Sequence, residues 1–190
     1  MNKQQDLNKI AKEIRNCKIC PINKIGKAVP GEGNPDADVM FVGEAPGKTE
    51  SKVGKPFIGR SGQLLRKMIR EIGLKEADVF IGSPVKYLPV YGTPKKSDIE
   101  HGKTHLLKQI AIIQPKIIVL LGATAAKALI DGPVATLKEH GTTMRVGNGL
   151  KPFPTYFLTI HPAAAMRFPQ LRKLFQEDFK KLKTLMHKEI

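Results

Sequence analysis

Short apolar runs alternate along the chain with longer segments whose apolar residues recur at helical spacing. The apolar runs predict four buried strands, over residues 38–42, 78–81, 116–121 and 156–160. Helical periodicity and capping signals predict helices over residues 3–15, 61–72, 97–113, from Gly122 through Ile130, and 170–187. Strands separated by helices indicate a parallel sheet that is covered on both faces. We therefore expect one α/β domain over residues 1–190, with a four-stranded parallel sheet flanked by helices.

The segments that connect the predicted helices and strands also contain residues that indicate local structure. Gly73 is expected to end the helix over residues 61–72, and Ser97 or Asp98 is expected to cap the helix over 97–113. The Pro/Gly-rich stretch 30–35 is expected to be a loop, and a Gly-rich hairpin region is expected around Gly147 to Gly149. In parallel sheets, ligands bind beyond the carboxyl ends of the strands. The segments that fall there are 43–47, 82–83, 122–123 and 161–162, so one cleft should gather them.

Composition and charge narrow the class of protein. The 190 residues are 41% hydrophobic and 26% charged, which is typical of a globular domain, and no apolar run approaches the roughly 20 residues of a membrane span. The polar N-terminus predicts no secretory signal, and hence a cytoplasmic protein without membrane partners. Lys and Arg number 32 against 17 Asp and Glu, a formal charge of +15, which favours a nucleic-acid partner.

The chain's two cysteines form a Cys-x-x-Cys pair, Cys17 and Cys20. In a protein of the cytosol this spacing indicates metal, cluster or redox chemistry rather than a structural disulfide. The pair does not follow a strand of a thioredoxin-like unit, which disfavours the redox motif. A tetrahedral metal or a cubane cluster needs four ligands, and only two thiols are present.

Three motifs carry candidate chemistry. Residues 43–47, Gly-Glu-Ala-Pro-Gly, form a tight loop after a strand, whose backbone N–H groups can approach an anion or a base. Phe57, between Pro56 and Gly59, can stack on a flat ring. His161 ends the last strand and is followed by small residues and Arg167, a pattern that permits close approach to DNA.

Together these motifs resemble the family 4 uracil-DNA glycosylases, the iron–sulfur type found in archaea and bacteria. The resemblance rests on residues 43–47, on the Gly-Lys-Pro-Phe-Ile-Gly run 54–59 and on residues 161–167, His-Pro-Ala-Ala-Ala-Met-Arg. It extends from the cysteine pair to the final helix. It implies the fold of the uracil-DNA glycosylase superfamily and a monofunctional enzyme of base excision repair, which flips uracil out of DNA and hydrolyses its N-glycosidic bond.

The resemblance also implies roles for individual residues. His161 and Glu44 would be catalytic: His161 stabilises negative charge on the uracil O2, and Glu44 helps to place the water. The uracil pocket would be formed by Gly43, Glu44, Phe57, Ser83 and His161, with Phe57 stacked on the flipped base. Arg167 would press on the DNA where the base has left. Apart from the resemblance, Lys48 and Lys86 are candidates for contacts with DNA phosphates, and we expect a monomer.

Two departures from the family pattern leave alternatives open. The family binds a four-iron, four-sulfur cluster through four cysteines, but Tyr87 and Gly102 stand where the third and fourth are expected. His101 and His105 are four residues apart on a predicted helix, so with Cys17 and Cys20 they could form a zinc site; the other reading is a loop held by packing alone.

The second departure concerns base specificity. Ser83 stands where the family has an Asn that reads the uracil edge. A serine hydroxyl offers one pairing point where a carboxamide offers a donor and an acceptor. Three functions therefore remain in view: a uracil-DNA glycosylase, a non-catalytic module that binds DNA or a lesion on the same scaffold, and a glycosylase with altered base preference.

Overall fold

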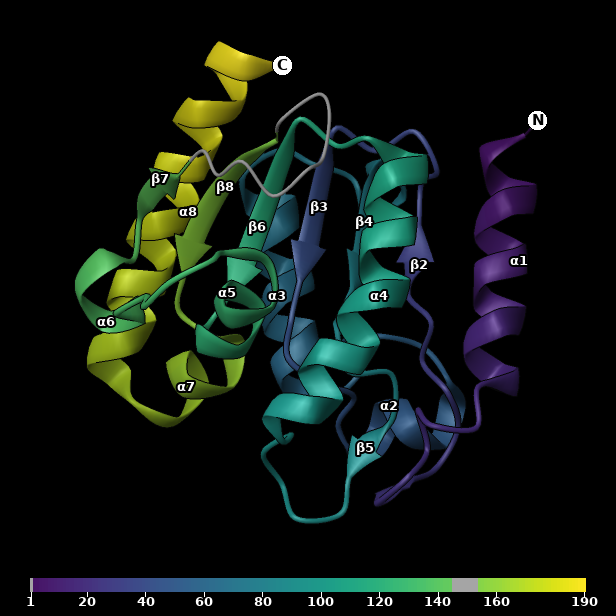
Figure 1. The fold of residues 1–190 in the computed structure, drawn as a ribbon. Helices are drawn as coiled ribbons and strands as arrows, with labels where there is room; N and C mark the ends of the chain where they lie inside the picture. Colours follow the sequence, from purple (N-terminus) through teal and green to yellow (C-terminus); the bar gives the residue numbers. More distant parts are fainter. Residues whose placement is uncertain (1, 145–153) are drawn as a thin grey trace.

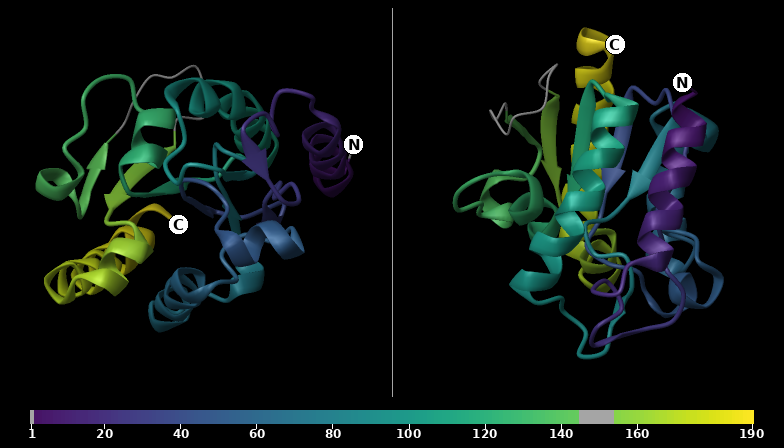
Figure 2. Two further views of the ribbon diagram at one scale, coloured as in Figure 1. Left: turned by 90° about the horizontal axis from the view of Figure 1, so that it is seen from below. Right: turned by 45° about the vertical axis from the view of Figure 1, so that its right-hand side comes forward.

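The computed structural model describes residues 2–144 and 154–190, and these contain a central sheet with helices on both faces (Figures 1 and 2). The order of strands in the sheet is β2-β4-β3-β6-β8-β7. Four of them run parallel: β3 (Val39–Val42), β4 (Val79–Gly82), β6 (Ile117–Leu121) and β8 (Thr155–Thr159). The four-stranded parallel sheet predicted from the apolar runs is therefore confirmed, each strand within about a residue of its expected bounds.

Two short antiparallel strands, which the sequence pattern does not predict, close the edges of this sheet. β2 (Glu32–Gly33) pairs with β4, and β7 (Thr142–Met144) pairs with β8. β2 lies within the Pro/Gly-rich stretch that was expected to be a loop throughout. A separate two-stranded ribbon joins β1 (Lys24–Ile25) to β5 (Leu88–Pro89). The expected hairpin around Gly147 to Gly149 lies outside the described residues.

The side chains of each parallel strand alternate between two cores. Val39 and Phe41 point into one core, which is covered by α3 (Arg60–Glu71), α7 (Pro162–Arg167) and α8 (Pro169–Glu189). Met40 and Val42 point into the other, which is covered by α4 (Lys96–Ile113) and α5 (Ala123–Leu129). Burial on both faces explains why the strands are continuously apolar rather than alternating. Figure 2 shows these two helical layers on opposite sides of the sheet.

The remaining helices lie at the periphery. α1 (Lys3–Asn16) stands beside α4 at the sheet edge that β2 closes, and two short helices, α2 (Lys48–Val53) and α6 (Thr136–Glu139), lie in connections (Figure 1). A 3-10 turn, η1 (Glu76–Asp78), precedes β4. None of the helices in residues 2–144 and 154–190 is long and apolar enough to cross a membrane.

The helix boundaries follow local chemistry. Gly73 adopts a φ of +93° after α3, as its expected role at the end of that helix requires. The N-cap of α4 is Lys95, not Ser97 or Asp98 as expected. Asp98, in the first turn, still stabilises the start of the helix. Its carboxylate accepts a hydrogen bond of 2.9 Å from the backbone N–H of Lys95.

Candidate active site

A cavity of about 250 Å³ opens at the carboxyl ends of the parallel strands. Loops that follow three different strands contribute to its wall, as the rule for parallel sheets predicts. Glu44 follows β3, Ser83 follows β4 and His161 follows β8; Phe57, from the connection before α3, completes the group. The structure therefore brings together four of the five pocket residues that the resemblance named. Gly43, the fifth, precedes Glu44 and lies against the Phe57 ring rather than in the cavity lining.

Glu44 is fixed by a neighbouring loop. The hydroxyl of Thr124, on α5, donates a hydrogen bond of 2.5 Å to the Oε2 atom of Glu44. Thr124 is buried and comes three residues after the end of β6. The sequence did not point to Thr124, although it directly follows residues 122–123, which were expected to line the cleft. With Oε2 held in this way, Oε1 of Glu44 is the oxygen that can orient a reactant.

His161 occupies the N-cap of α7 and is held as a neutral ring. Its Nδ1 atom accepts the backbone N–H of Ala163 at 3.2 Å, so the proton of the neutral imidazole resides on Nε2. Burial lowers the pKa of His161 from its usual 6.5, and the negative charge of Glu44 opposes that shift only in part. The ring thus offers an uncharged N–H donor at the pocket.

Gly122 allows the backbone after β6 to lie close to His161. It has a φ of +88°, and a Cβ at this position would lie 2.9 Å from the Cβ of His161. Only glycine meets both demands without strain.

Phe57 lies across the pocket from His161, with their ring centroids 6.3 Å apart and their planes inclined by 40°. Two glycines leave room for it. A Cβ on Gly43 would lie 2.4 Å from the Phe57 Cζ, and a Cβ on Gly62 would lie 2.1 Å from the Phe57 carbonyl carbon. Phe57 itself has a φ of +50°, in the left-handed region that non-glycine residues rarely adopt.

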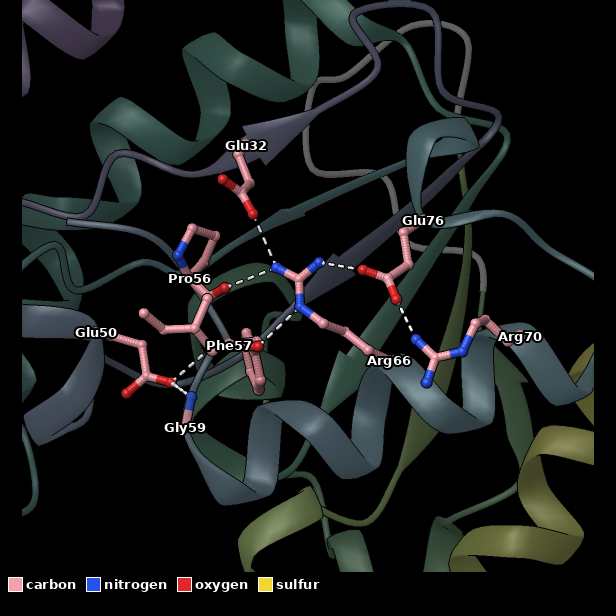
Figure 3. Close-up of polar contacts among 9 residues, drawn as sticks. Glu32, Glu50, Pro56, Phe57, Gly59, Arg66, Arg70 and Glu76 are labelled. Carbon is pink, nitrogen blue, oxygen red and sulfur yellow. Dashed lines mark hydrogen bonds and ion pairs between the residues drawn. The ribbon is translucent and has the colours of Figure 1, made fainter. Parts of the chain in front are cut away.

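Two charged side chains hold the Phe57 loop from either side, and the sequence did not point to either (Figure 3). Arg66, on α3, donates to the carbonyl oxygens of Pro56 at 3.0 Å and Phe57 at 2.9 Å. The buried carboxylate of Glu50 accepts the backbone N–H groups of Ile58 at 2.9 Å and Gly59 at 2.7 Å. The ring of Phe57 is therefore positioned through its own backbone and that of its neighbours.

Arg66 is itself held by acidic side chains. It forms ion pairs with Glu32 of β2 at 2.8 Å and with Glu76 at 2.6 Å, and Arg70 also bonds to Glu76 (Figure 3). Burial alone would lower the pKa of Arg66, but these pairs raise it. The guanidinium therefore stays charged while it supports the loop.

Ser83 is buried in the pocket wall, and its hydroxyl group already donates a hydrogen bond within the protein. The Oγ–H group donates to the carbonyl oxygen of Val85 at 2.8 Å. The oxygen that remains can only accept hydrogen bonds. Ser83 thus presents an acceptor, where the Asn of the family would present an acceptor and a donor.

The basic residues expected at DNA separate into two environments. Lys48 and Arg167 line a shallow groove of about 460 Å³ together with Arg60, and this groove shares Gly47 and Ala163 with the pocket. Lys86 does not reach any such surface, so the prediction that it contacts DNA is wrong. Its side chain is 2% exposed and its Nζ donates to Pro30 O at 3.1 Å and to Gln109 Oε1 at 2.9 Å.

The Cys-x-x-Cys pair meets two histidines of α4. The ligand atoms of Cys17, Cys20, His101 and His105 all lie within 4.8 Å of one another, and the Sγ of Cys17 lies 3.2 Å from the Nε2 of His101. These residues could hold a metal ion. Burial raises the pKa of Cys17, but contacts with the Cys20 backbone and the rings of His105 and His101 outweigh it and bring that pKa to about 6. Burial and the neighbouring Cys17 raise the pKa of Cys20 to about 12.

The residues around this pair do not fit a four-iron, four-sulfur cluster. Such a cluster is held by cysteine thiolates, and the chain has two cysteines. Tyr87, at the third expected position, packs against Cys20 in a small apolar cluster. At Gly102, the fourth position, a Cβ would lie 1.9 Å from the carbonyl oxygen of Pro84, so this backbone has closed over the place of the missing side chain.

Comparison with known proteins agrees with this architecture. The model of the uracil DNA glycosylase superfamily matches residues 30–183. Type-4 uracil-DNA glycosylases are similar along nearly the whole chain: that of Sulfurisphaera tokodaii is 42% identical, covering 94% of this chain and 84% of its own. That of Pyrobaculum aerophilum is 40% identical over 91% of both chains, and that of Thermotoga maritima is 38% identical over 100% of both. The chain belongs to the uracil-DNA glycosylase superfamily and, within it, to the type-4 uracil-DNA glycosylases.

Proposed function

We propose that this protein hydrolyses the N-glycosidic bond of uracil in DNA and so initiates base excision repair. The observation that carries the proposal is the fixed tautomer of His161, whose Nε2–H is free to donate because Nδ1 is occupied by the Ala163 N–H at 3.2 Å. An uncharged donor beside a pocket of about 250 Å³ suits a single planar base that leaves as an anion. The names of the similar proteins, type-4 uracil-DNA glycosylases, support the same activity.

The proposed reaction uses each pocket residue in a distinct way. The base leaves the duplex and lies against the ring of Phe57. As the C1′–N1 bond breaks, its electron pair passes to the uracil ring, and His161 Nε2–H stabilises the charge that develops on O2. Glu44 Oε1 orients a water whose oxygen bonds to C1′ and whose proton passes to the carboxylate. None of these steps involves the Cys17–Cys20 loop.

Ser83 determines which bases are accepted in this proposal. Its oxygen is an acceptor, so it pairs with a ring N–H such as the N3–H of uracil, directly or through a water. The unprotonated N3 of cytosine would place a lone pair against that oxygen, which is unfavourable. Hypoxanthine also presents a ring N–H. A glycosylase that accepts hypoxanthine is therefore the second candidate function, and the acceptor-only state of Ser83 is the observation that favours it.

DNA is the proposed partner, and one chain supplies the whole site. The groove that contains Lys48, Arg60 and Arg167 adjoins the pocket, so these cations can hold the phosphates that flank an extruded nucleotide. Arg167 packs over the exposed ring of Phe168, with the guanidinium carbon 5.4 Å from its centroid. This end of α7 is suited to press on the duplex beside the site.

The test is base release from single-stranded oligonucleotides that carry uracil, cytosine or hypoxanthine at one position. The proposal expects release of uracil and a fall of about 10²–10³-fold in the His161→Ala variant, the usual effect of removing one electrostatic stabiliser. The exposed His187 provides a matched control, since His187→Ala should leave the rate unchanged. Release of hypoxanthine alone would establish the second candidate. Binding of DNA without release of any base would overturn both and make this chain a recognition module.

A further inference from the structure

We propose that Cys17, Cys20, His101 and His105 bind a single zinc ion, which takes the place of the iron–sulfur cluster in this chain. The site shares no residue with the pocket and does not depend on the proposed reaction. It joins the loop after α1 to His101 and His105 of α4, two segments that are 84 residues apart at the Cys17–His101 contact.

The spacing of the ligand atoms fits one ion. A tetrahedral site with Zn–S bonds of about 2.3 Å and Zn–N bonds of about 2.0–2.1 Å has its ligand atoms about 3.3–3.8 Å apart. The four ligand atoms here lie within 4.8 Å of one another, and the Cys17 Sγ to His101 Nε2 distance of 3.2 Å is already that short. Small side-chain adjustments would therefore complete the tetrahedron. An iron–sulfur cluster places its protein ligands on different iron atoms, which requires a wider spacing.

His105 provides an independent sign that a ligand belongs here. It is 4% exposed, and neither of its ring nitrogens makes a hydrogen bond of good geometry, although its ring faces the two thiols and its Nδ1 lies near Glu13. A buried imidazole nitrogen that makes no hydrogen bond is unfavourable, and buried polar atoms in proteins are almost always satisfied. A metal ion bonded to one nitrogen removes that penalty.

The second nitrogen of His105 faces a carboxylate. Its Nδ1 lies 3.4 Å from the Oε1 atom of Glu13, which is also paired with Lys108. Histidines that bind metals usually direct their other ring N–H to such a group, which fixes the tautomer. This arrangement assigns Nε2 of His105 to the metal and Nδ1–H to Glu13.

The donor set selects the metal and its role. Two thiolates and two imidazoles in a tetrahedron are the preferred set for Zn²⁺. Because all four ligands come from the protein, no position is left for a substrate or water, and the ion is structural. It would fasten the end of α1 to α4.

The first experiment measures metal content and then replaces the metal with cobalt. Protein purified without a metal-affinity tag should contain about one zinc per chain and less than a tenth of that amount of iron. After removal of the metal, titration with Co²⁺ should saturate at one equivalent. It should give the visible absorption of a tetrahedral ion together with a thiolate charge-transfer band. Iron at two or more per chain, or the absence of any Co²⁺ spectrum, would overturn the proposal.

Variants assign the ligands. His105→Gln and His101→Gln should each weaken Zn²⁺ by more than the 10–100-fold that is typical of a lost outer-shell partner. His187→Gln, on an exposed face of α8, is the matched control and should bind Zn²⁺ with unchanged affinity. If His105→Gln does not fold, the partly exposed His101 still tests the site, because its loss must alter the Co²⁺ spectrum. An unaltered spectrum in His101→Gln would exclude this ligand set.

Discussion

The Nε–H group of Arg66 donates a hydrogen bond of 2.9 Å to the carbonyl oxygen of Phe57, nine residues earlier in the chain. This contact supports Phe57 in a left-handed backbone conformation, with a φ of +50°. A non-glycine residue in the left-handed region is unfavourable by about 1–3 kcal/mol, and such strain persists only where the surroundings enforce it. The guanidinium therefore determines where the aromatic face of the pocket stands, although it does not line the pocket itself.

We expect the substitution Arg66→Met to lower both activity and stability. It keeps the aliphatic stem but leaves the Pro56 and Phe57 carbonyls without donors and Glu32 and Glu76 without their partner. Misplacement of the Phe57 ring should slow base release about 10–100-fold. Thermal denaturation should show a clear fall in Tm. Lys67→Met, on the exposed side of the same helix, is the control; equal effects of the two changes would show that Arg66 has no special role.

Gly43→Ala should destabilise the protein through a single contact. The new methyl would meet the Phe57 Cζ at 2.4 Å, and overpacking of this kind is unfavourable by about 1–3 kcal/mol. In a Phe57→Leu background the ring tip is gone, so the same substitution should have a smaller effect. A double-mutant cycle of urea denaturation measures the difference. Additive effects would mean that Gly43 is required for another reason.

The ionisation of His161 should be visible by NMR. Nitrogen chemical shifts should show the neutral tautomer with its proton on Nε2, and the ring should titrate below pH 6.5 because burial lowers its pKa. In Glu44→Gln the pKa should fall further, since the carboxylate favours the imidazolium. The unfolded chain binds this proton more readily than the native one. Acidification from pH 6.5 toward the native pKa should therefore weaken stability. A native pKa above 6.5 would contradict this account.

The salt dependence of DNA binding should separate the basic residues. Arg167→Gln and Lys48→Gln should each weaken binding and reduce the slope of log K against log salt by about 1. Lys86→Met should leave that slope unchanged, because the ammonium is enclosed by Pro30 and Gln109. Its effect should be a lower Tm instead. Fluorescence anisotropy at several salt concentrations distinguishes these outcomes, and a reduced slope for Lys86→Met would refute its buried assignment.

The parts of this molecule that the sequence predicts are those with a repeating pattern or a topological rule. The four parallel strands are continuous apolar runs, and Glu44, Ser83 and His161 meet because each follows the carboxyl end of such a strand. The short helices α2 and α7 have six residues each, which is too few for helical periodicity to emerge. The edge strand β2, with two residues, is hidden in the same way.

The charged residues that support the site could not be predicted. Glu50, Arg66 and Lys86 look like surface positions, because charge usually indicates exposure, yet Glu50 and Lys86 are buried. Their roles depend on which backbone atoms the fold brings near them. From the sequence, Cys17 and His101 could either share a metal site or belong to a loop held by packing alone. Only the packing of α1 against α4 brings their side chains together.

The two short antiparallel strands have a consequence for how the chain behaves when many copies are present. A parallel sheet that ended at β4 and β8 would present two rows of unpaired amide groups, each a template for another chain. β2 covers one row with only two residues, and Glu32 within it is tied to Arg66. β7 covers the other row with three. Edge strands this short pair poorly with further strands. The described fold therefore disfavours the edge-to-edge strand addition that leads to aggregation.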